Sequence, residues 1–309
     1  MRPSLLRCLV ISPLAFSLAI PSAFGWGRSG HMMINHIAIE KLPADVPAFL
    51  RSKRAAEQIE YMGPEPDRWK AQPEPELNTA QSPEHYIDIE WADLIGTLPR
   101  KRFDYIHSLE AAQKAHPELG LVPEKVGLLP YQSTEVWERL KSAMRDYRAL
   151  KKDHKSTQAV EALIVFYAGW LGHYVGDGSQ PLHVTIKYNG WVGDNPNGYT
   201  TEHKIHAKFE SDFVKANIKE KDVAALVPEK PLPHGDFFDD YMAYLRHSNS
   251  LVEKTYQLDQ AHAFDGEGTD AGKEFALERI AAGATELRDL IYFAWTESAT
   301  PLPPSKWSD

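Results

Sequence analysis

Cysteine is almost absent from this chain of 309 residues, which contains one, Cys8. A single cysteine cannot form a disulfide within the chain, so the fold needs another source of stabilisation. Long apolar runs are equally scarce. The run over Leu9–Ile20 is broken by serine and proline and is too short for a membrane anchor, and no later segment is apolar enough to span a bilayer.

The amino terminus has the composition of a secretory leader. Arg2 and Arg7 make it basic, the apolar run follows, and Ala23-Phe24-Gly25 fits the small-x-small pattern of a cleavage site. We therefore expect a signal peptide over residues 1–25, a mature chain that begins at Trp26, and a secreted or periplasmic protein. The mature chain would then contain no cysteine, and bound metal could replace disulfides as a source of stability.

An excess of positive charge is also lacking. The net charge is −9, and removal of the two arginines with the leader would make it −11. An acidic protein is a poor general partner for nucleic acid or for an anionic membrane, which argues against a wide basic groove. A local site whose positive charge comes from metal ions remains compatible with this composition.

Apolar residues at helical spacing dominate the rest of the chain and predict an all-α fold. We expect one multi-helix domain over residues 26–298, followed by a loose tail over 299–309. The segment from Pro64 to Pro83 holds five prolines and predicts an ordered surface loop, and residues 85–88 alternate as a short strand would. Helices are expected over 32–42, 46–62, 105–115, 134–150, 159–178, 202–218, 236–258 and 271–298.

Two pairs of metal-ligating side chains stand four residues apart. His173 precedes Asp177, and His206 precedes Glu210. Positions i and i+4 share one face of a helix, so each pair can present two ligands to one point. Pro181 should end the first helix and turn His183 towards a different point. The pattern predicts two neighbouring metal sites with His183 between them.

A single pair of this kind more often belongs to a solvated helix face than to a metal site. Here, however, there are two pairs and an extra histidine next to a proline, and His173 lies within a mostly hydrophobic segment, 163–174, where polar groups are costly to bury without partners. Imidazole and carboxylate together are a usual ligand set for zinc when cysteine is absent. Zinc is therefore the expected metal.

Five motifs together resemble the superfamily of zinc-dependent bacterial phospholipases C and single-strand-specific nucleases of the mung-bean and mould type. In order they are WGRSGH, the aspartate of PDRWK, HYID, HYVGDGSQPLH and HAKFE, and they extend from Trp26 to Glu210. Each motif alone is weak, because its residues would more often serve as turn, cap or core residues. Their combination in this order is specific and spans most of the predicted mature chain.

The resemblance implies a cleft with three zinc ions. Asp67, His85, His173 and Asp177 would hold the first zinc, and Asp177 would bridge it to the second. The free amine and the carbonyl of Trp26, together with His31, would hold that second zinc. His183, His206 and Glu210 would hold the third. Cleavage of the leader would create the amine, so processing would complete the site.

The implied reaction is the in-line attack of a zinc-bound hydroxide on a phosphorus atom, with Asp67 and Lys70 at the reacting centre. Lys70 follows Asp67 by three positions, where we expect the nucleases to carry an arginine that binds the phosphate. A lysine there supplies a point charge, without the bidentate geometry of a guanidinium. A solvated loop lysine is the competing interpretation.

The motifs favour nucleic acid over phospholipid as the substrate. The spacing in WGxxGH is similar to the start of the nucleases, and HYID offers Tyr86 to stack on a base and Asp88 to hydrogen-bond its edge. Glu210 points the other way, because the phospholipases end this motif with glutamate and the nucleases with aspartate. We expect a single-strand-preferring endonuclease and 3′-nucleotidase that acts on single-stranded DNA, RNA or nucleotides. A phospholipase C and a non-catalytic zinc-binding protein remain the alternatives.

Overall fold

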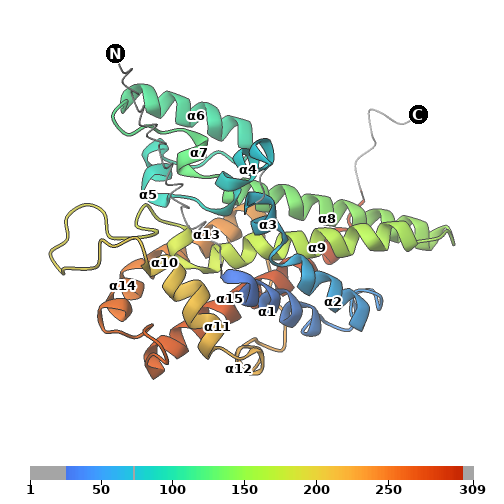
Figure 1. Cartoon of the computed structure of the whole chain (residues 1–309). Coiled ribbons are helices and arrows are strands. Elements are labelled where there is room, and N and C mark those ends of the chain that lie inside the picture. The colour runs from blue at the N-terminus through green and yellow to red at the C-terminus, as the bar shows by residue number, and fades with distance from the viewer. Residues whose placement is uncertain (1–25, 72–73, 302–309) are drawn as a thin grey trace, which may run out of the picture.

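A computed structural model describes residues 26–71 and 74–301 (Figure 1). The predicted signal peptide, 1–25, lies outside the described residues, as does most of the predicted tail. Within the described residues, the regular structure is helical, and the β structure is limited to two isolated bridges, Ile87 with Gly127 and Tyr188 with Gly190. The prediction of an all-α fold is confirmed.

The longest helices form the centre of the fold. These are α8 (Leu129–Lys152), α9 (Gln158–Ser179) and α15 (Asp270–Glu297), and α9 packs on both of the others. Helices α1 (Gly27–Glu40) and α2 (Lys53–Met62) pack on each other and on α9 (Figure 1). The central position of α9 follows from its apolar sequence, because its last nine residues are buried around the whole circumference.

Shorter elements cover this centre. In Figure 1, α4 to α7 lie on one side of α8 and α9, and α11 and α12 lie on the other side, near α1. The shorter α-helices are α3 (Glu65–Ala71), α4 (Pro75–Gln81), α5 (Ile89–Ala92), α6 (Arg102–Ala115), α7 (Pro123–Val126), α10 (Ile205–Ala207), α11 (Val214–Asn217), α12 (Glu220–Ala224), α13 (Phe237–Ser250) and α14 (Val252–Gln260). Three 3₁₀ helices, η1 (Ser82–His85), η2 (Asp93–Ile95) and η3 (Pro181–His183), and one π-helix, η4 (Lys208–Phe213), complete the set.

The prediction of a surface loop between Pro64 and Pro83 is wrong. The described part of this segment forms α3, α4 and η1. Proline disrupts a helix interior but fits its first turn, where its missing N–H would have no partner. Pro75 begins α4, and Pro83 lies in the first turn of η1. Proline content alone therefore misled the sequence interpretation.

Other boundaries also differ from the prediction. The second helix begins at Lys53 because the side chain of Ser52 accepts a hydrogen bond from the Ala55 N–H and caps it. The expected strand at 85–88 is a single bridge, since η1 and α5 flank it closely. The helix expected over 236–258 is divided at Leu251 into α13 and α14, and the one expected over 202–218 begins at Ile205 and includes a π-helix.

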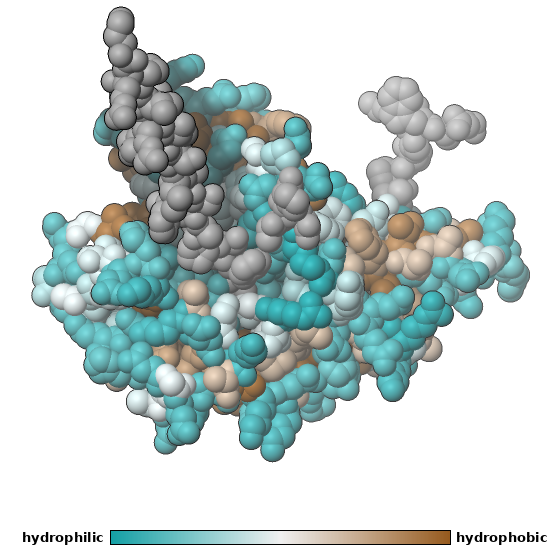
Figure 2. All heavy atoms as spheres, in the orientation of Figure 1, coloured by the Kyte–Doolittle hydropathy of each residue, from teal (hydrophilic) through white to brown (hydrophobic). Residues whose placement is uncertain are grey.

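The face shown in Figure 2 is mostly hydrophilic. Apolar residues show on it in patches, one over α8 and α9 short of their right-hand tip and one at the top, near α6. In the described part of the chain, none of the helices has the length and apolar character that a membrane crossing requires.

Candidate metal centre and adjoining cleft

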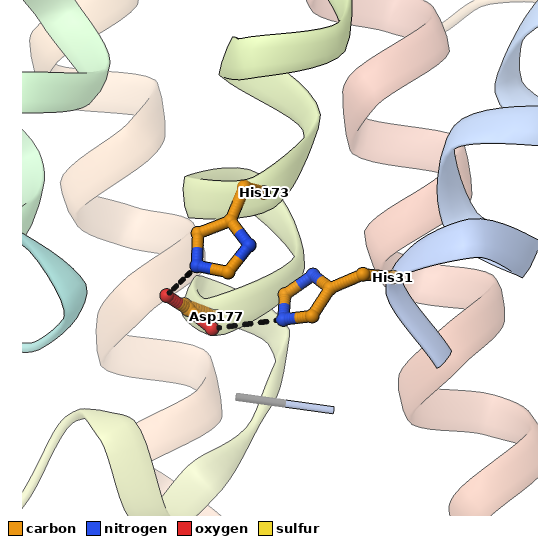
Figure 3. A group of neighbouring side chains, drawn as sticks. All are labelled: His31, His173 and Asp177. Atoms are coloured by element: carbon orange, nitrogen blue, oxygen red, sulfur yellow. Dashed lines mark ion pairs between the residues drawn. The ribbon is translucent and has the colours of Figure 1, made fainter. Parts of the chain in front are cut away.

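The buried end of α9 carries the first group of ligating side chains. His173 and Asp177 lie one turn apart and are fully buried, with His173 Nε2 3.2 Å from Asp177 Oδ2. His31 reaches the same carboxylate from α1, with its Nε2 3.3 Å from Oδ1 (Figure 3). The three side chains point towards one another, and their ligand atoms are close enough to hold one metal ion.

Close packing of α1 on α9 makes this contact possible. A Cβ atom at Gly176 would lie 2.9 Å from Nδ1 of His31, which is shorter than a van der Waals contact allows. A Cβ atom at Gly63 would lie 2.7 Å from the carbonyl oxygen of His31. Glycine at these two positions therefore lets the backbone of α1 bring His31 to the carboxylate of α9.

The second group shares His173 and adds two residues from the segment that was expected to be a loop and a strand. Asp67 comes from α3 and His85 from the end of η1, and both are buried. His85 Nδ1 lies 2.8 Å from His173 Nε2 and 3.7 Å from Asp67 Oδ1. The same nitrogen is 3.1 Å from Asp177 Oδ2, so Asp177 lies between this group and the first.

The third group combines His183, His206 and Glu210. His206 Nε2 is 2.8 Å from Glu210 Oε2, and His183 Nε2 is 3.5 Å from the same oxygen. Glu210 lies in the π-helix η4 and is fully buried. As expected, α9 ends before Pro181, which begins η3 and places His183 apart from His173 and Asp177. Its Nδ1 is still only 3.7 Å from Asp177 Oδ1.

Backbone carbonyls orient three of the imidazoles. Nδ1 of His173 lies 2.7 Å from the oxygen of Gly63, Nδ1 of His183 lies 2.7 Å from that of His85, and Nδ1 of His206 lies 2.9 Å from that of Tyr188. A carbonyl oxygen accepts only, so each Nδ1 carries a proton and each Nε2 faces the other side chains of its group. Outer partners of this kind are usual around metal-binding histidines.

Several buried polar atoms at this centre have no hydrogen-bond partner. An orphaned buried polar atom costs about 1–3 kcal/mol, so a cluster of them calls for compensation. A cation among the three groups would satisfy them together, and the donor set of imidazole and carboxylate suits a divalent metal. The atoms are both ring nitrogens of His31, Nε2 of His85, Oδ1 of Asp177 and Oε1 of Glu210.

Electrostatics holds several of these groups in the ionisation state that a metal needs. Burial lowers the pKa of His31 and, with the charge of Lys70, lowers that of His85 to about 3. Burial alone would raise the pKa of Asp177, but the charges of His173 and His183 hold it well below its ordinary value. The carboxylate is therefore ionised and the two low-pKa imidazoles are neutral over the physiological range.

His183 shows the opposite shift. Burial lowers its pKa, but the carboxylates of Asp177 and Glu210 outweigh that effect and raise it to about 9. Without a cation, the ring would therefore bind a proton at neutral pH. A metal ion at the third group would displace that proton, so proton and metal compete for this side chain.

Trp26 lies beside the centre as a packed side chain. It is fully buried, its indole Nε1 donates to Ser179 Oγ at 2.6 Å, and its ring meets Phe209 edge-on at 5.3 Å. Its carbonyl oxygen accepts the Gly30 N–H at 3.1 Å. The metal-binding roles of its amine and carbonyl stay predictions, because the bond that cleavage would break lies at the edge of the described residues.

A cavity of about 690 Å³ opens beside the second and third groups. His85, His183 and His206 line it, and so do the three side chains predicted to contact the substrate, Lys70, Tyr86 and Asp88. The Nζ atom of Lys70 is 3.0 Å from Asp67 Oδ1, so this lysine pairs with a candidate ligand. Burial, with Glu90 nearby, raises the pKa of Asp88 to about 8.

Other residues of the cavity wall were missed by the sequence interpretation. Trp91 and Lys125 belong to short helices and to no recognised motif. The spacing of Trp91, three residues after Asp88, was the available signal, because one helical turn brings such positions to the same side. Lys125 is distant in sequence and gave no signal.

One group of potential ligands lies elsewhere. His36 and Glu40 of α1 and Glu220 of α12 gather at the surface, with His36 Nδ1 2.6 Å from Glu220 Oε1. These side chains are partly or well exposed, and an ordinary ion pair accounts for them.

The family model for S1/P1 nuclease matches residues 26–301, which include every candidate ligand. The chain belongs to the S1/P1 nuclease family. No curated protein matches the sequence. Membership in the family supports a phosphodiester-cleaving nuclease with nucleic acid as its substrate, and the three buried groups could hold its metal ions.

Proposed function

We propose that this chain is an exported zinc-dependent phosphodiesterase, with residues 26–298 as its catalytic domain. Its activity would be that of an endonuclease that prefers single strands and of a 3′-nucleotidase. The observation that carries the proposal is the cluster of three adjoining buried ligand groups, two of which border one cavity, in a chain of the S1/P1 nuclease family.

Three zinc ions per chain are the proposed complement. Asp177 would connect the first zinc, held with Asp67, His85 and His173, to the second, held by His31 and Trp26. His183, His206 and Glu210 would hold the third. The neutral imidazoles, ionised carboxylates and orphaned atoms described above support this assignment. When bound, zinc would supply an acidified water nucleophile and neutralise charge on the phosphate.

The residues of the chain would position the substrate. Lys70 faces the cavity next to Asp67, and its ammonium group would attract a phosphate oxygen while Asp67 keeps the lysine oriented. Tyr86 would stack on the adjacent base. Asp88 has a pKa of about 8, so at neutral pH its carboxyl is mostly protonated and would donate a hydrogen bond to an acceptor on the edge of the base.

The test compares substrates on one preparation of mature protein loaded with zinc. We expect cleavage of single-stranded DNA or RNA, slower cleavage of duplex, release of phosphate from 3′-nucleotides, and loss of all three activities with a chelator. Three zinc ions per chain should be found by elemental analysis. Release of diacylglycerol from phosphatidylcholine without nucleolysis would replace the proposal with a phospholipase C. Full zinc content without either activity would indicate a binding protein.

A further inference from the structure

A lysine and a tryptophan meet at the wall of the cavity, beyond the residues to which a role has been given. Lys125 Nζ lies 4.1 Å from the centre of the Trp91 ring, and both residues line the cavity. Trp91 is partly exposed and Lys125 is exposed. Within the described residues Lys125 forms no ion pair with a carboxylate, although its ammonium group also donates to the carbonyl oxygen of Leu119.

Hydrogen bonds fix this pair relative to the proposed base-binding residues. The Trp91 N–H donates to the Asp88 carbonyl oxygen at 3.0 Å, and the Asp88 N–H donates to the Val126 carbonyl oxygen at 2.7 Å. The hydroxyl of Tyr86 donates to the carbonyl oxygen of Glu124, next to Lys125. The segment 86–88 is thus hydrogen-bonded to α5 and α7, the two helices that carry Trp91 and Lys125.

We propose that Trp91 and Lys125 form a second nucleotide-binding point for single-stranded nucleic acid, next to the one formed by Tyr86 and Asp88. Trp91 stacks on a second base, and the ammonium group of Lys125 binds a phosphate of the same strand. This inference rests on the proposed nuclease function. According to this inference, the cavity binds a stretch of single-stranded nucleic acid longer than one nucleotide.

Charge and chemistry favour this occupant. Sites for single strands combine cations that follow the backbone with aromatic rings on which bases stack. This chain is acidic, so an exposed lysine that stands beside an aromatic ring and forms no ion pair among the described residues, although its charge acts on the Asp88 carboxyl, is a local exception to the net charge. An indole ring can stack on any of the bases. This agrees with an enzyme that selects single strands and has no preference for a particular sequence.

The test measures how the rate depends on substrate length. Wild type, Lys125→Gln and Trp91→Ala are assayed on thymidine 3′-monophosphate and on an oligodeoxythymidylate, with zinc content as the check on folding. For the oligonucleotide, we expect Trp91→Ala to lower kcat/KM by about 5- to 100-fold, the range of a lost base stack. Lys125→Gln should raise KM and reduce the slope of log KM against log salt by about 0.7. Both variants should stay within about two-fold of wild type on the mononucleotide.

Lys141→Gln is the matched control, because Lys141 Nζ also lies 4.1 Å from a tryptophan ring, that of Trp137, but outside this cavity. It should behave as wild type on both substrates. Equal losses on the two substrates, or none, in the Trp91 and Lys125 variants would overturn the second binding point and leave the nuclease proposal intact. A zinc-loaded wild type that cleaves neither substrate would overturn both proposals.

Discussion

The substitution Gly176→Ala tests whether metal binding requires His31 in the position that the packing of α1 on α9 gives it. The alanine Cβ atom would stand 2.9 Å from His31 Nδ1 and 3.1 Å from its Cε1, whereas ordinary contact begins near 3.4 Å. The imidazole must therefore move by about half an ångström, which is the tolerance within which a functional site has to be held. We expect Gly176→Ala to lower the affinity for one metal ion by about 10- to 100-fold, the usual effect of disturbing the surroundings of a ligand.

Gly178→Ala is the matched control on the same helix. Its Cβ atom would lie 2.8 Å from Leu245 Cδ2 and 2.9 Å from Tyr244 Cε1, so it is just as crowded but touches core side chains. Each variant gains about 1 kcal/mol of helix propensity and loses about 1–3 kcal/mol to overpacking, so their thermal midpoints should change alike.

Metal content after dialysis against graded chelator, read by elemental analysis, separates the two variants. Gly176→Ala should lose metal at lower chelator concentration, and nuclease activity should fall with it. Equal retention of metal in the two variants would refute the argument that the close approach of α1 to α9 positions a ligand.

Three further predictions follow from the site. Removal of metal should lower the thermal midpoint by about 5–10 °C per site. Metal at 100 times Kd adds about 2.7 kcal/mol to the free energy of unfolding, and each kcal/mol shifts the midpoint of a domain of this size by about 2–4 °C. An unchanged midpoint in calorimetry would contradict the idea that a metal ion satisfies the orphaned atoms. The folded pKa of Asp88, about 8, exceeds its ordinary 3.8, so between these values the folded chain keeps a proton that the unfolded chain releases. Wild-type stability should therefore fall relative to Asp88→Asn as the pH rises from about 4 to 8, by at most about 1.4 kcal/mol per unit, and parallel melting curves would refute the shift. An alanine inserted between the leader and Trp26 should remove one metal ion and most activity if the amine is a ligand, and full metal content in that variant would exclude this role.

Local spacing explains what the sequence could predict of the site. His173 with Asp177, and His206 with Glu210, are four residues apart on helices, so their convergence needs no knowledge of the tertiary fold. The π-helix at Glu210 was not expected, yet it keeps the pair together, with His206 Nε2 2.8 Å from Glu210 Oε2.

The remaining ligands depend on tertiary packing. His31, Asp67 and His85 come from three different elements, and no periodicity relates them to α9. Only the resemblance of their motifs to a known family predicted that they meet. The position of His31 depends further on two glycines at helix contacts, Gly63 and Gly176, which sequence reasoning had not singled out.

The short elements were predicted least well. Helices of four residues, such as α5 and α7, contain one turn and cannot display a periodic pattern. Trp91 and Lys125 belong to these two helices, so the outer wall of the cavity escaped the sequence analysis. The prolines between Pro64 and Pro83 were interpreted as loop residues, although two of them stand in the first turns of α4 and η1, where proline is well tolerated.

Hydrogen bonds through the backbone carbonyls of His85 and His183 link the second ligand group to the third. The carbonyl of His85 accepts from His183 Nδ1 at 2.7 Å, and the carbonyl of His183 in turn accepts the Ile87 N–H at 3.0 Å. His183, a candidate ligand of the third group, is therefore hydrogen-bonded through both its side chain and its backbone to segment 85–87. That segment carries His85, a candidate ligand of the second group. If these groups hold metal ions as proposed, an ion bound by one of them would restrict the motion of the other. We therefore expect the wild type to take up these ions cooperatively.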